Sequence, residues 1–405
     1  MNLTLWKKVL IGMLIGIISG YFFPQYYLLA KPFAIIYTNL IKMMIIPTVF
    51  SAILFGMTNI RDIHTLGRIG IKSIIIYFFV TILAVTIGIT SAHYFAPGID
   101  SFALCNFMNI NNFSPITTIE EIIIGMFPSN PIFAMANGNT LQVVVFALIV
   151  GLSIVLVGDK ADDLRKVIVS TTNVLFKTIE LILKLTPYGV FFIMVWIIGE
   201  YGFTLILHLS KLMLVIMYAF TIQYLFFGLI LLLFKLNPIH FYKKTFNIQS
   251  VAFATSSSKA TISTAIKDLQ DKLGVSKKIA GFILPLGTAI NMTGSAIYIA
   301  ICALFFAQIT GMHLTTYQYI ILIVTSTIGS IGAAGCPSGG VIMLTMVLHS
   351  IGLPVDGVSM IMGIDRFVDM FRTVINVTGD CAVTVITDKM ENSLNMKIYN
   401  DCNIK

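Results

Sequence analysis

A run of charged and amide side chains near the carboxyl end of the sequence contains the residues that could do chemistry. Three aspartates, two arginines and one asparagine fall between positions 365 and 380 of a chain that is otherwise strongly apolar. On an α-helix, at about 100° per residue, most of these side chains share a stripe of roughly 80°. The stripe consists of Asp365, Asp369, Arg372, Asn376 and Asp380. The sequence therefore predicts a membrane helix with one charged edge.

Two interpretations of this charged edge are open from the residues alone. A charged side chain at the centre of a bilayer costs about 2.5 to 3.5 kcal/mol, so the edge must face protein, water or a ligand. Three acids against two arginines leave one negative charge, which a bound cation could neutralise. Alternatively the edge is a structural ladder of ion pairs, in which Asp369 and Arg372 satisfy each other three residues apart.

The composition is that of a polytopic membrane protein. Hydrophobic residues make up 57% of the 405 positions and charged residues 11%, whereas globular proteins carry about a quarter charged residues. Apolar segments that approach the roughly 20 residues needed to cross a bilayer recur along the chain, and more follow after Ala280. The earlier ones are Val9–Phe23, Phe33–Met57, Ile74–Phe95, Leu141–Val157 and Leu212–Phe234.

The net charge of +8 is spread over short loops, which fits the positive-inside bias and leaves no patch for nucleic acid. Lys7 and Lys8 precede the first apolar segment, and Arg61, Arg68 and Lys72 follow the second, so these stretches are expected in the cytoplasm. No signal-peptide cleavage site follows the first segment, and we expect that segment to be retained. The five cysteines show no paired spacing, so they indicate neither a metal site nor a disulfide framework.

Two features of the first apolar segments predict how they pack. Gly12, Gly16 and Gly20 recur at four-residue intervals, a seam of small residues that lets another helix approach closely in lipid. Pro47 lies inside the second segment, where a membrane helix tolerates proline if the freed backbone groups find partners.

Two later segments carry a polar tip between apolar halves that are each too short to cross a bilayer. The tips are Thr255–Lys259 and Gly335–Gly340. Irregular backbone at membrane depth persists only where it is buried in protein or lines a cavity, so each tip should border a site. A long helix with a polar interruption follows each tip, at Asn291–Ser295 and at Asn376–Asp380. This duplication is typical of inverted-repeat secondary transporters, which bind ligands near the membrane midplane.

On these motifs the chain resembles the dicarboxylate/amino acid:cation symporters, the family of glutamate and aspartate transporters. The resemblance covers nearly the whole chain and is strongest in the serine-rich tip, Leu284–Gly287 with Asn291, the second tip and Asp365–Asp380. The expected fold is an all-α membrane protein with about eight transmembrane helices, two re-entrant helical hairpins and inverted repeats. Residues 1–405 would form one membrane domain, with scaffold helices mainly within 1–70 and 115–205 and a transport unit mainly within 71–98 and 208–390.

Residue by residue, the resemblance implies a substrate site on the charged helix. Arg372 would grip the side-chain carboxylate of the substrate as a planar bidentate donor. Asp369 would take the α-ammonium group, and Thr373 and Asn376 would form hydrogen bonds with the rest of the molecule. The α-carboxylate would rest on the first tip, at Ser256 and Ser257, with Ser295 nearby. The outer lid would be the second tip, Cys336, Pro337, Ser338, Gly339 and Gly340.

The resemblance also implies cation sites, with Na⁺ or H⁺ as the coupling ion and no other cofactor. One would be built from the backbone carbonyls of Gly287, Asn291 and Asn376 with the carboxylate of Asp380. A second would use backbone oxygens of Ala289, Ser330, Ile331 and Ala333. Relatives commonly have an aspartate in place of Thr293 and a threonine in place of Val80 in a third site. Without that carboxylate a third desolvated cation loses its main counter-charge.

The expected function is therefore the import of an acidic amino acid, glutamate or aspartate, coupled to Na⁺ or H⁺ by alternating access in the inner (plasma) membrane. The family implies a homotrimer in the lipid bilayer. A C4-dicarboxylate:cation symporter is the alternative, although such a substrate has no ammonium group for Asp369. A remote alternative is an intramembrane serine hydrolase, with Ser330 or a tip serine as nucleophile and His349 as base. A channel is a third class. Its selectivity ring needs several copies of a short pore motif, whereas this chain carries an asymmetric charged helix of its own.

Overall fold

The computed structural model describes residues 5–58, 63–99, 124–125, 127–202, 204–332, 339–355 and 358–401. Within these ranges the chain is helical and contains no strand, which confirms the all-α prediction. The helices of the first half are α1 Leu5–Phe22, α2 Tyr27–Met43, α3 Ile45–Thr58, α4 Ile63–Phe95, α6 Pro131–Ala136, α7 Thr140–Val157, α8 Asp162–Leu183 and α9 Thr186–Tyr201. Those of the second half are α10 Thr204–Leu233, α11 Pro238–Thr255, α12 Ser258–Leu273, α13 Lys277–Ile290, α14 Thr293–Ile309, α15 Thr316–Gly332, α16 Gly339–Ser350, α17 Val358–Met390 and α18 Met396–Asn400.

Five stretches of the described chain are long and apolar enough to cross a membrane. They are Pro24–Phe55, Ile69–Phe95, Gln142–Ile182, Leu207–Leu233 and Lys277–Ile309. The last of these differs from the others because 94% of its most apolar window is buried inside the protein, against 33% to 44% for the rest. Lys277–Ile309 is therefore a central segment wrapped by other helices, whereas the other four present much of their surface to lipid.

The glycine seam of α1 packs against α9. A Cβ atom added at Gly12 would lie 2.4 Å from the carbonyl oxygen of Pro187, and one at Gly16 would lie 2.7 Å from that of Phe191. At Gly20 the added atom would lie 2.9 Å from Cβ of Ile198. These distances are shorter than any real Cβ contact, so larger residues would force the helices apart. The predicted use of the seam as a helix contact is confirmed.

The segment predicted as one apolar run at Phe33–Met57 is broken in two. Helix α2 ends at Met43 and α3 begins at Ile45. Pro47 stands four residues after Met43, so it has no N–H for the Met43 carbonyl and its ring would clash with that group. Pro47 itself lies in the first turn of α3, so the prediction that a membrane helix tolerates this proline is confirmed, and the break between the two helices is at Met44.

The first polar tip joins two helices into a hairpin. Ser256 ends α11 in the left-handed conformation, with φ 49° and ψ 36°, and reverses the chain. Ser257 then caps α12, because its side chain accepts a hydrogen bond of 3.3 Å from the N–H of Ala260. The arms have 18 and 16 residues and pack against each other. A helical hairpin with a serine tip is confirmed, although its arms are longer than the apolar halves suggested.

The second hairpin consists of α15 and α16, which also pack against each other. A hydrogen bond of 3.3 Å from Ser350 to Thr325 joins its arms. Most of the predicted second tip, from Gly335 to Ser338, lies outside the described residues. Gly339 and Gly340 form the first turn of α16.

Only one of the two predicted polar interruptions breaks a helix. Asn291 and Met292 leave helical geometry, with ψ of 89° and 55°, and separate α13 from α14. Helix α17, in contrast, runs without a break through Asn376–Asp380, so the second predicted interruption was wrong. The polar groups of α17 are side chains along one edge, and its backbone remains hydrogen-bonded; Thr384, for example, adds a bond of 2.6 Å to the Asp380 carbonyl.

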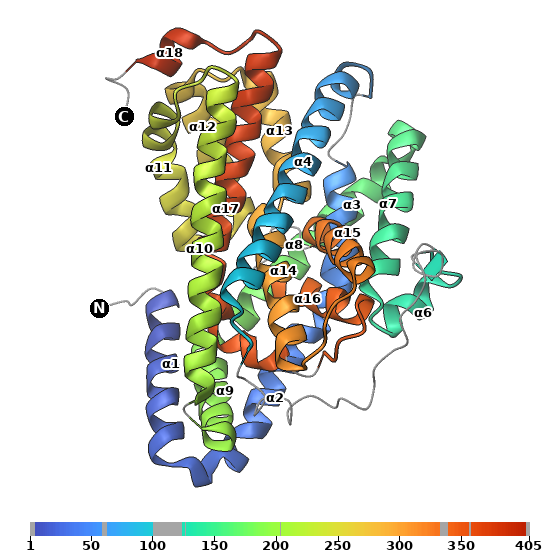
Figure 1. Ribbon diagram of the computed structural model, residues 1–405. Helices are drawn as coiled ribbons and strands as arrows, with labels where there is room; N and C mark the ends of the chain where they lie inside the picture. The colour runs from blue at the N-terminus through green and yellow to red at the C-terminus, as the bar shows by residue number, and fades with distance from the viewer. Residues whose placement is uncertain are drawn as a thin grey trace.

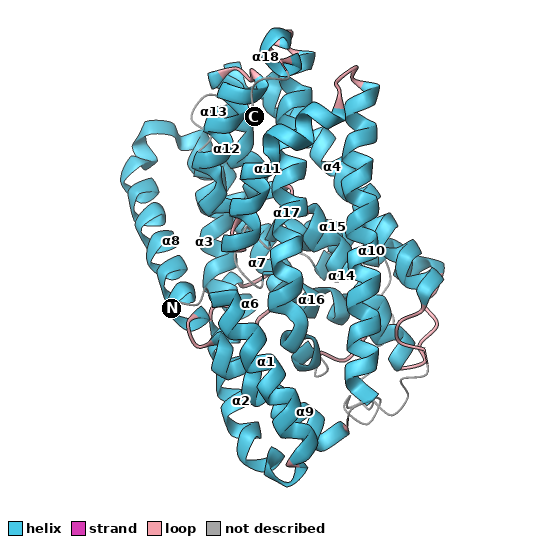
Figure 2. Ribbon diagram, turned by 90° about the vertical axis from the view of Figure 1, so that its left-hand side faces the viewer, coloured by secondary structure: helices cyan, strands magenta, loops and turns pink. Residues whose placement is uncertain are grey.

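Helix α17 lies at the centre of the second half of the chain. It packs against α10, α11, α12, α13 and α14, and it also contacts α1 and α9. Figure 1 shows α1, α2 and α9 grouped at the end opposite to the C-terminus, and Figure 2 shows the same three helices side by side from another direction. The charged helix is thus enclosed by the helices that carry the predicted motifs.

Candidate functional site

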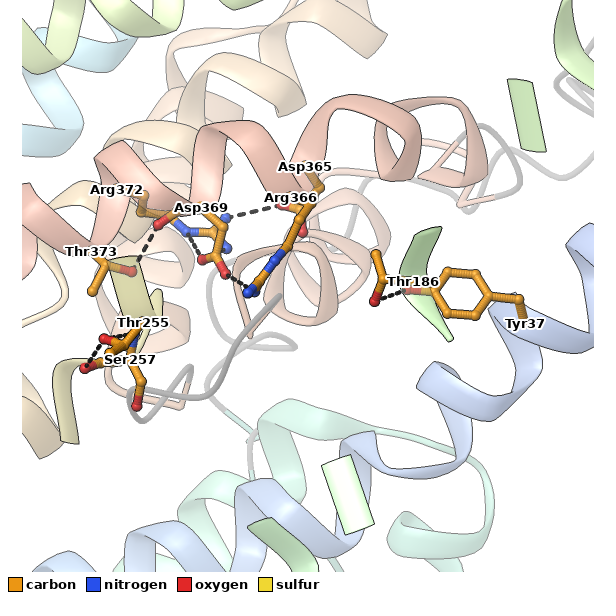
Figure 3. Close-up of polar contacts among 9 residues, drawn as sticks. All are labelled: Tyr37, Thr186, Thr255, Ser257, Asp365, Arg366, Asp369, Arg372 and Thr373. Carbon is orange, nitrogen blue, oxygen red and sulfur yellow. Dashed lines mark hydrogen bonds and ion pairs between the residues drawn. The ribbon is translucent and has the colours of Figure 1, made fainter. Parts of the chain in front are cut away.

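Arg372 is the centre of the charged row on α17. Its side chain is 2% exposed, and the whole guanidinium is occupied by acids of the same helix. Nη1 donates to Asp365 at 3.2 Å, and Nε donates to Asp369 at 3.1 Å, where Nη2 forms a second, short bond to the same oxygen. Figure 3 shows these contacts side by side. The pairing of Asp369 with Arg372 that the structural interpretation predicted is therefore present.

Arg366 supplies the second positive charge of the row. Its Nη1 lies 3.4 Å from Oδ2 of Asp369, the carboxylate oxygen that Arg372 leaves free. Two aspartates, at 365 and 369, then face two arginines, at 366 and 372, and their charges cancel. Arg366 was predicted only as one of the charges of the row, without a role. Its place three residues before Asp369 on a helix could have indicated this pair. A charged ligand must exchange with one of these internal partners.

Two further elements reach Arg372 from outside α17. The ring of Tyr298, on α14, lies 4.7 Å from Cζ of Arg372, a cation–π contact. A Cβ atom added at Gly340, in the first turn of α16, would lie only 2.2 Å from Nη1 of Arg372. Tyr298 was not predicted as a site residue. Its place one helical turn after Gly294, and so on the same face of α14, could have indicated it. The second hairpin thus closes directly over the guanidinium.

The broken segment between α13 and α14 reaches the next turn of α17. The N–H of Gly294 donates to the side-chain oxygen of Asn376 at 2.8 Å. A Cβ atom at Gly294 would lie 2.6 Å from the carbonyl oxygen of Arg372, so only glycine permits this approach. Ser295, the next residue, is 4% exposed. The structure therefore brings together Ser295, Arg372 and Asn376.

The serine tip is near this group but not bonded to it. Phe253, two residues before the end of α11, stacks edge to face on Phe371 of α17, with ring centroids 5.1 Å apart. Ser256 is 2% exposed, and its hydroxyl has no hydrogen-bond partner. Thr373 uses its hydroxyl within α17, donating to the Asp369 carbonyl at 2.7 Å. No hydrogen bond between described residues joins Ser256 or Ser257 to the charged row.

The lid residues can be placed only in part. Cys336, Pro337 and Ser338 lie outside the described residues, while Gly339 and Gly340 are helical. The contact of Gly340 with Arg372 is consistent with a lid at this position.

Asp380 is the acid that the arginines leave unmatched. It is 1% exposed, and one of its oxygens accepts a hydrogen bond of 2.9 Å from Nδ2 of Asn291, while the other has no partner. A Cβ atom added at Gly287 would lie 2.7 Å from this carboxylate and 2.5 Å from the Tyr77 hydroxyl. The predicted cation residues Gly287, Asn291 and Asp380 are thus brought into contact, and Asn376 lies one turn earlier on α17.

Two buried side-chain oxygen atoms at this contact have no hydrogen-bond partner among the described residues. They are the second oxygen of Asp380 and the side-chain oxygen of Asn291, whose amide nitrogen binds the carboxylate. Oxygen ligands of this kind suit a hard cation, and an unpaired buried carboxylate is costly until a positive charge arrives. The donor set therefore fits a small cation beside Asp380.

The residues of the other two predicted cation sites lie on adjoining helices. Helix α13, which carries Ala289, packs against α15, which ends with Ser330 and Ile331. Ala333 lies outside the described residues. Val80 and Thr81, at the third site, are buried at 1% and 3% exposed, and both lie on α4 one turn after Tyr77.

No observation supports the hydrolase alternative at Ser330. The hydroxyl of Ser330 is fully buried and donates to the Thr327 carbonyl of its own helix at 2.7 Å, whereas His349 is exposed. A nucleophile and its base must lie within about 3 Å of each other, and no hydrogen bond between described residues joins these two side chains.

Comparison with known proteins agrees with this arrangement. Residues 5–390 match the model of the Sodium:dicarboxylate symporter family. The chain is 29% identical over 402 residues to a proton/glutamate-aspartate symporter of Bacillus subtilis, covering 98% of this chain and 97% of that protein. It is 30% identical to a proton/sodium-glutamate symport protein of Bacillus caldotenax, covering 96% and 94%, and 30% identical to a C4-dicarboxylate transport protein of Edwardsiella ictaluri, covering 98% and 95%. The chain belongs to the sodium:dicarboxylate symporter family.

Proposed function

We propose that this protein imports an acidic amino acid, glutamate or aspartate, by symport with Na⁺ or H⁺. It is a multi-pass protein of the plasma membrane, and symport is the activity in the name of its family. The observation that carries the proposal is the buried pair of Arg372 and Asp369, two opposite charges 3.1 Å apart, flanked by three converging motifs. A zwitterion with an additional carboxylate presents complementary groups to both side chains.

Substrate binding is then an exchange of ion pairs. The side-chain carboxylate of the substrate replaces Asp365 and Asp369 on the guanidinium of Arg372, which offers a planar fork for it. This exchange releases the carboxylate of Asp369 from Arg372, and the α-ammonium group of the substrate then pairs with it. Ser256, Ser257 and Ser295 supply donors for the α-carboxylate, and the residues after Ala333 close over the ligand. The ammonium group replaces Arg372 as the partner of Asp369. Asp365 gives up its bond with Arg372, and the substrate brings one net negative charge, which a bound cation would offset.

Cation binding at Asp380 couples to this exchange through the broken segment. Asn291 contacts Asp380, and Gly294, three residues later, contacts Asn376 and Arg372. A cation beside Asp380 fixes the backbone between α13 and α14, and that backbone borders the substrate. The two ligands therefore stabilise the same local arrangement, which is the condition for positive coupling.

Transport itself would follow from movement of one group of helices past another. Helices α1, α2 and α9 pack together and would belong to a fixed scaffold, whereas α10 to α14 pack around α17 and would move as a transport unit with the two hairpins. We further propose that both hairpins are re-entrant and that the protein is a homotrimer. The mass of the detergent-solubilised particle tests the trimer.

The proposed substrate site is tested by replacing Arg372. Arg372→Ala should abolish uptake of labelled aspartate into proteoliposomes, because it removes the carboxylate partner. A matched control is Arg165→Ala, which removes another arginine paired with an aspartate three residues away, Asp162, at 2.7 Å but far from α17. Uptake should be measured with an imposed Na⁺ gradient and, separately, with an imposed proton gradient. Aspartate uptake by the Arg372 variant equal to wild type would refute the site, and uptake independent of both gradients would refute symport.

A C4-dicarboxylate is a second candidate substrate, and one contact favours it. Because Arg366 already neutralises one oxygen of Asp369, a substrate without an ammonium group would not leave that carboxylate bare. Competition between succinate and labelled aspartate separates the two substrates. Succinate that competes at concentrations similar to those of unlabelled aspartate would show that the site accepts both.

A further inference from the structure

The contact between Arg366 and Asp369 has a consequence for selectivity. Arg366 is 7% exposed, and it lies outside the set of residues that would hold the substrate. Its contact with Asp369, at 3.4 Å, is the longest of the ion pairs in the row, against 3.1 and 3.2 Å for bonds of Arg372. At that length a charged hydrogen bond is weak, so this is the partner that Asp369 loses most easily.

We propose that Arg366 stands in for the ammonium group of the substrate. In the ligand-free protein it neutralises Asp369, and it must give way when an amino acid binds, so it sets the preference between dicarboxylic substrates with and without an ammonium group. This inference rests on the proposed function, because it takes Asp369 as the ammonium site.

The pairing of Asp369 supports the exchange. Without ligand, Asp365 and Asp369 are matched by Arg366 and Arg372. Aspartate brings an ammonium group that can replace Arg366 on Asp369, whereas succinate brings none and needs Arg366 to stay in place. Arg366 therefore competes with the ammonium group of one ligand and supports binding of the other.

The surroundings of Arg366 allow it to leave. Its Nε is buried and has no hydrogen-bond partner, so only part of its donor capacity is used. The Tyr37 hydroxyl donates to Thr186 at 2.9 Å, and its oxygen can accept a hydrogen bond from the displaced guanidinium. Tyr37 and Thr186 belong to α2 and α9, and Figure 3 draws this pair beside the charged row. α9 contacts α17, so the displaced arginine would turn toward the helices proposed as scaffold.

Arg366→Gln tests this role. The dissociation constants for L-aspartate and for succinate are measured by calorimetry on the purified full-length protein in saturating NaCl. Removal of the competitor should strengthen L-aspartate binding about tenfold, and loss of the neutralising charge should weaken succinate binding about tenfold, from the strength of one charged hydrogen bond. Arg366→Lys keeps the charge and should restore a ratio close to wild type. The control Arg165→Gln, away from the site, should leave both constants unchanged.

A structural role for Arg366 would move both constants by the same factor and in the same direction, and that result, or no change, would overturn the inference. If Arg366→Gln fails to fold, Asp369→Asn is measured in its place, because it removes the acid that Arg366 neutralises. Aspartate should then bind about tenfold more weakly, since its ammonium group loses its partner, whereas succinate should not weaken, since no bare carboxylate remains; equal weakening of both ligands would overturn the inference. A wild-type protein that binds neither ligand would instead refute the proposed function itself, and with it this inference.

Discussion

The carboxylate of Asp380 offers the sharpest test of cation coupling, because its replacement should have opposite effects with and without the cation. Asp380→Asn keeps the size of the side chain and removes its charge. In the structure this carboxylate is 1% exposed and has one oxygen without a partner. A buried charge that lacks a partner costs about 3 to 5 kcal/mol, so its removal should stabilise the cation-free protein by part of that amount.

In the presence of Na⁺ the order should reverse. A cation at a hundred times its dissociation constant stabilises the protein that binds it by about 2.7 kcal/mol. For a chain of this size, that corresponds to a rise in the midpoint of thermal unfolding of about 3 to 5 °C. Wild type should show this rise between choline chloride and NaCl of equal ionic strength, and Asp380→Asn should not. If H⁺ is the coupling ion, lowering the pH should produce the rise in place of Na⁺.

Asp388 provides the matched control for this experiment. It is fully buried on the same helix, but it accepts hydrogen bonds from both the N–H and the hydroxyl of Ser276, at 2.9 and 2.8 Å. Asp388→Asn should therefore lower the unfolding temperature in both salts and leave the increment due to Na⁺ unchanged. If Asp380→Asn behaves in the same way as Asp388→Asn, Asp380 is a structural carboxylate and the reasoning fails. The same scan rate must be used throughout, because irreversible unfolding makes the midpoint depend on it.

Three further substitutions test the packing and the charges around the site. Gly340→Ala places a new atom 2.2 Å from the Arg372 guanidinium, which it should displace, so aspartate binding should weaken about tenfold or more in a calorimetric titration. Gly281→Ala is the control: its new atom meets nothing within 4 Å, so the dissociation constant for aspartate should not change. Gly16→Ala should cost about 1 to 3 kcal/mol by separating α1 from α9, seen as a lower unfolding temperature than that of Gly281→Ala. Lys72→Met removes an ion pair of 2.6 Å whose lysine is 34% exposed, so it should cost no more than about 1 kcal/mol, and less in high salt; a larger, salt-independent loss would contradict a surface pair.

The sequence predicted the elements of this fold where a local pattern decides them. Apolar length predicted the membrane helices, and glycine spacing predicted the contact of α1 with α9. The Ser256 turn followed from polar residues between apolar halves. The sequence did not show the break at Met44, just before a proline that lacks a backbone donor. The predicted polar interruption at Asn376–Asp380 was wrong, because Asn376 and Asp380 bind other helices with their side chains and leave the backbone of α17 intact.

The site was predicted as a set of residues but not as a set of pairs. Helical spacing places Asp369, Arg372 and Asn376 on one edge, and the resemblance supplies their roles. The three-residue spacing could have indicated a pair of Arg366 and Asp369. It could not show which carboxylate oxygen Arg366 contacts, or that Tyr298 covers the guanidinium of Arg372. Both contacts depend on rotamers and on the approach of another helix, which a single sequence does not encode in its periodicity.

The two groups of acids on α17 differ in a way that separates substrate from cation. Asp365 and Asp369 are neutralised within the helix, so the substrate end carries no net charge before an anionic substrate binds. Asp380 has no arginine partner among the described residues, so the cation end can be neutralised only by adding a charge or a proton. Bringing an anionic substrate into the first end adds a negative charge to a buried helix, and a cation at the second end offsets it across about two helical turns. Coupling in this protein would then follow from the electrostatics of one helix. The Asn291–Gly294 backbone contacts both sites, so it would allow them to close at the same time.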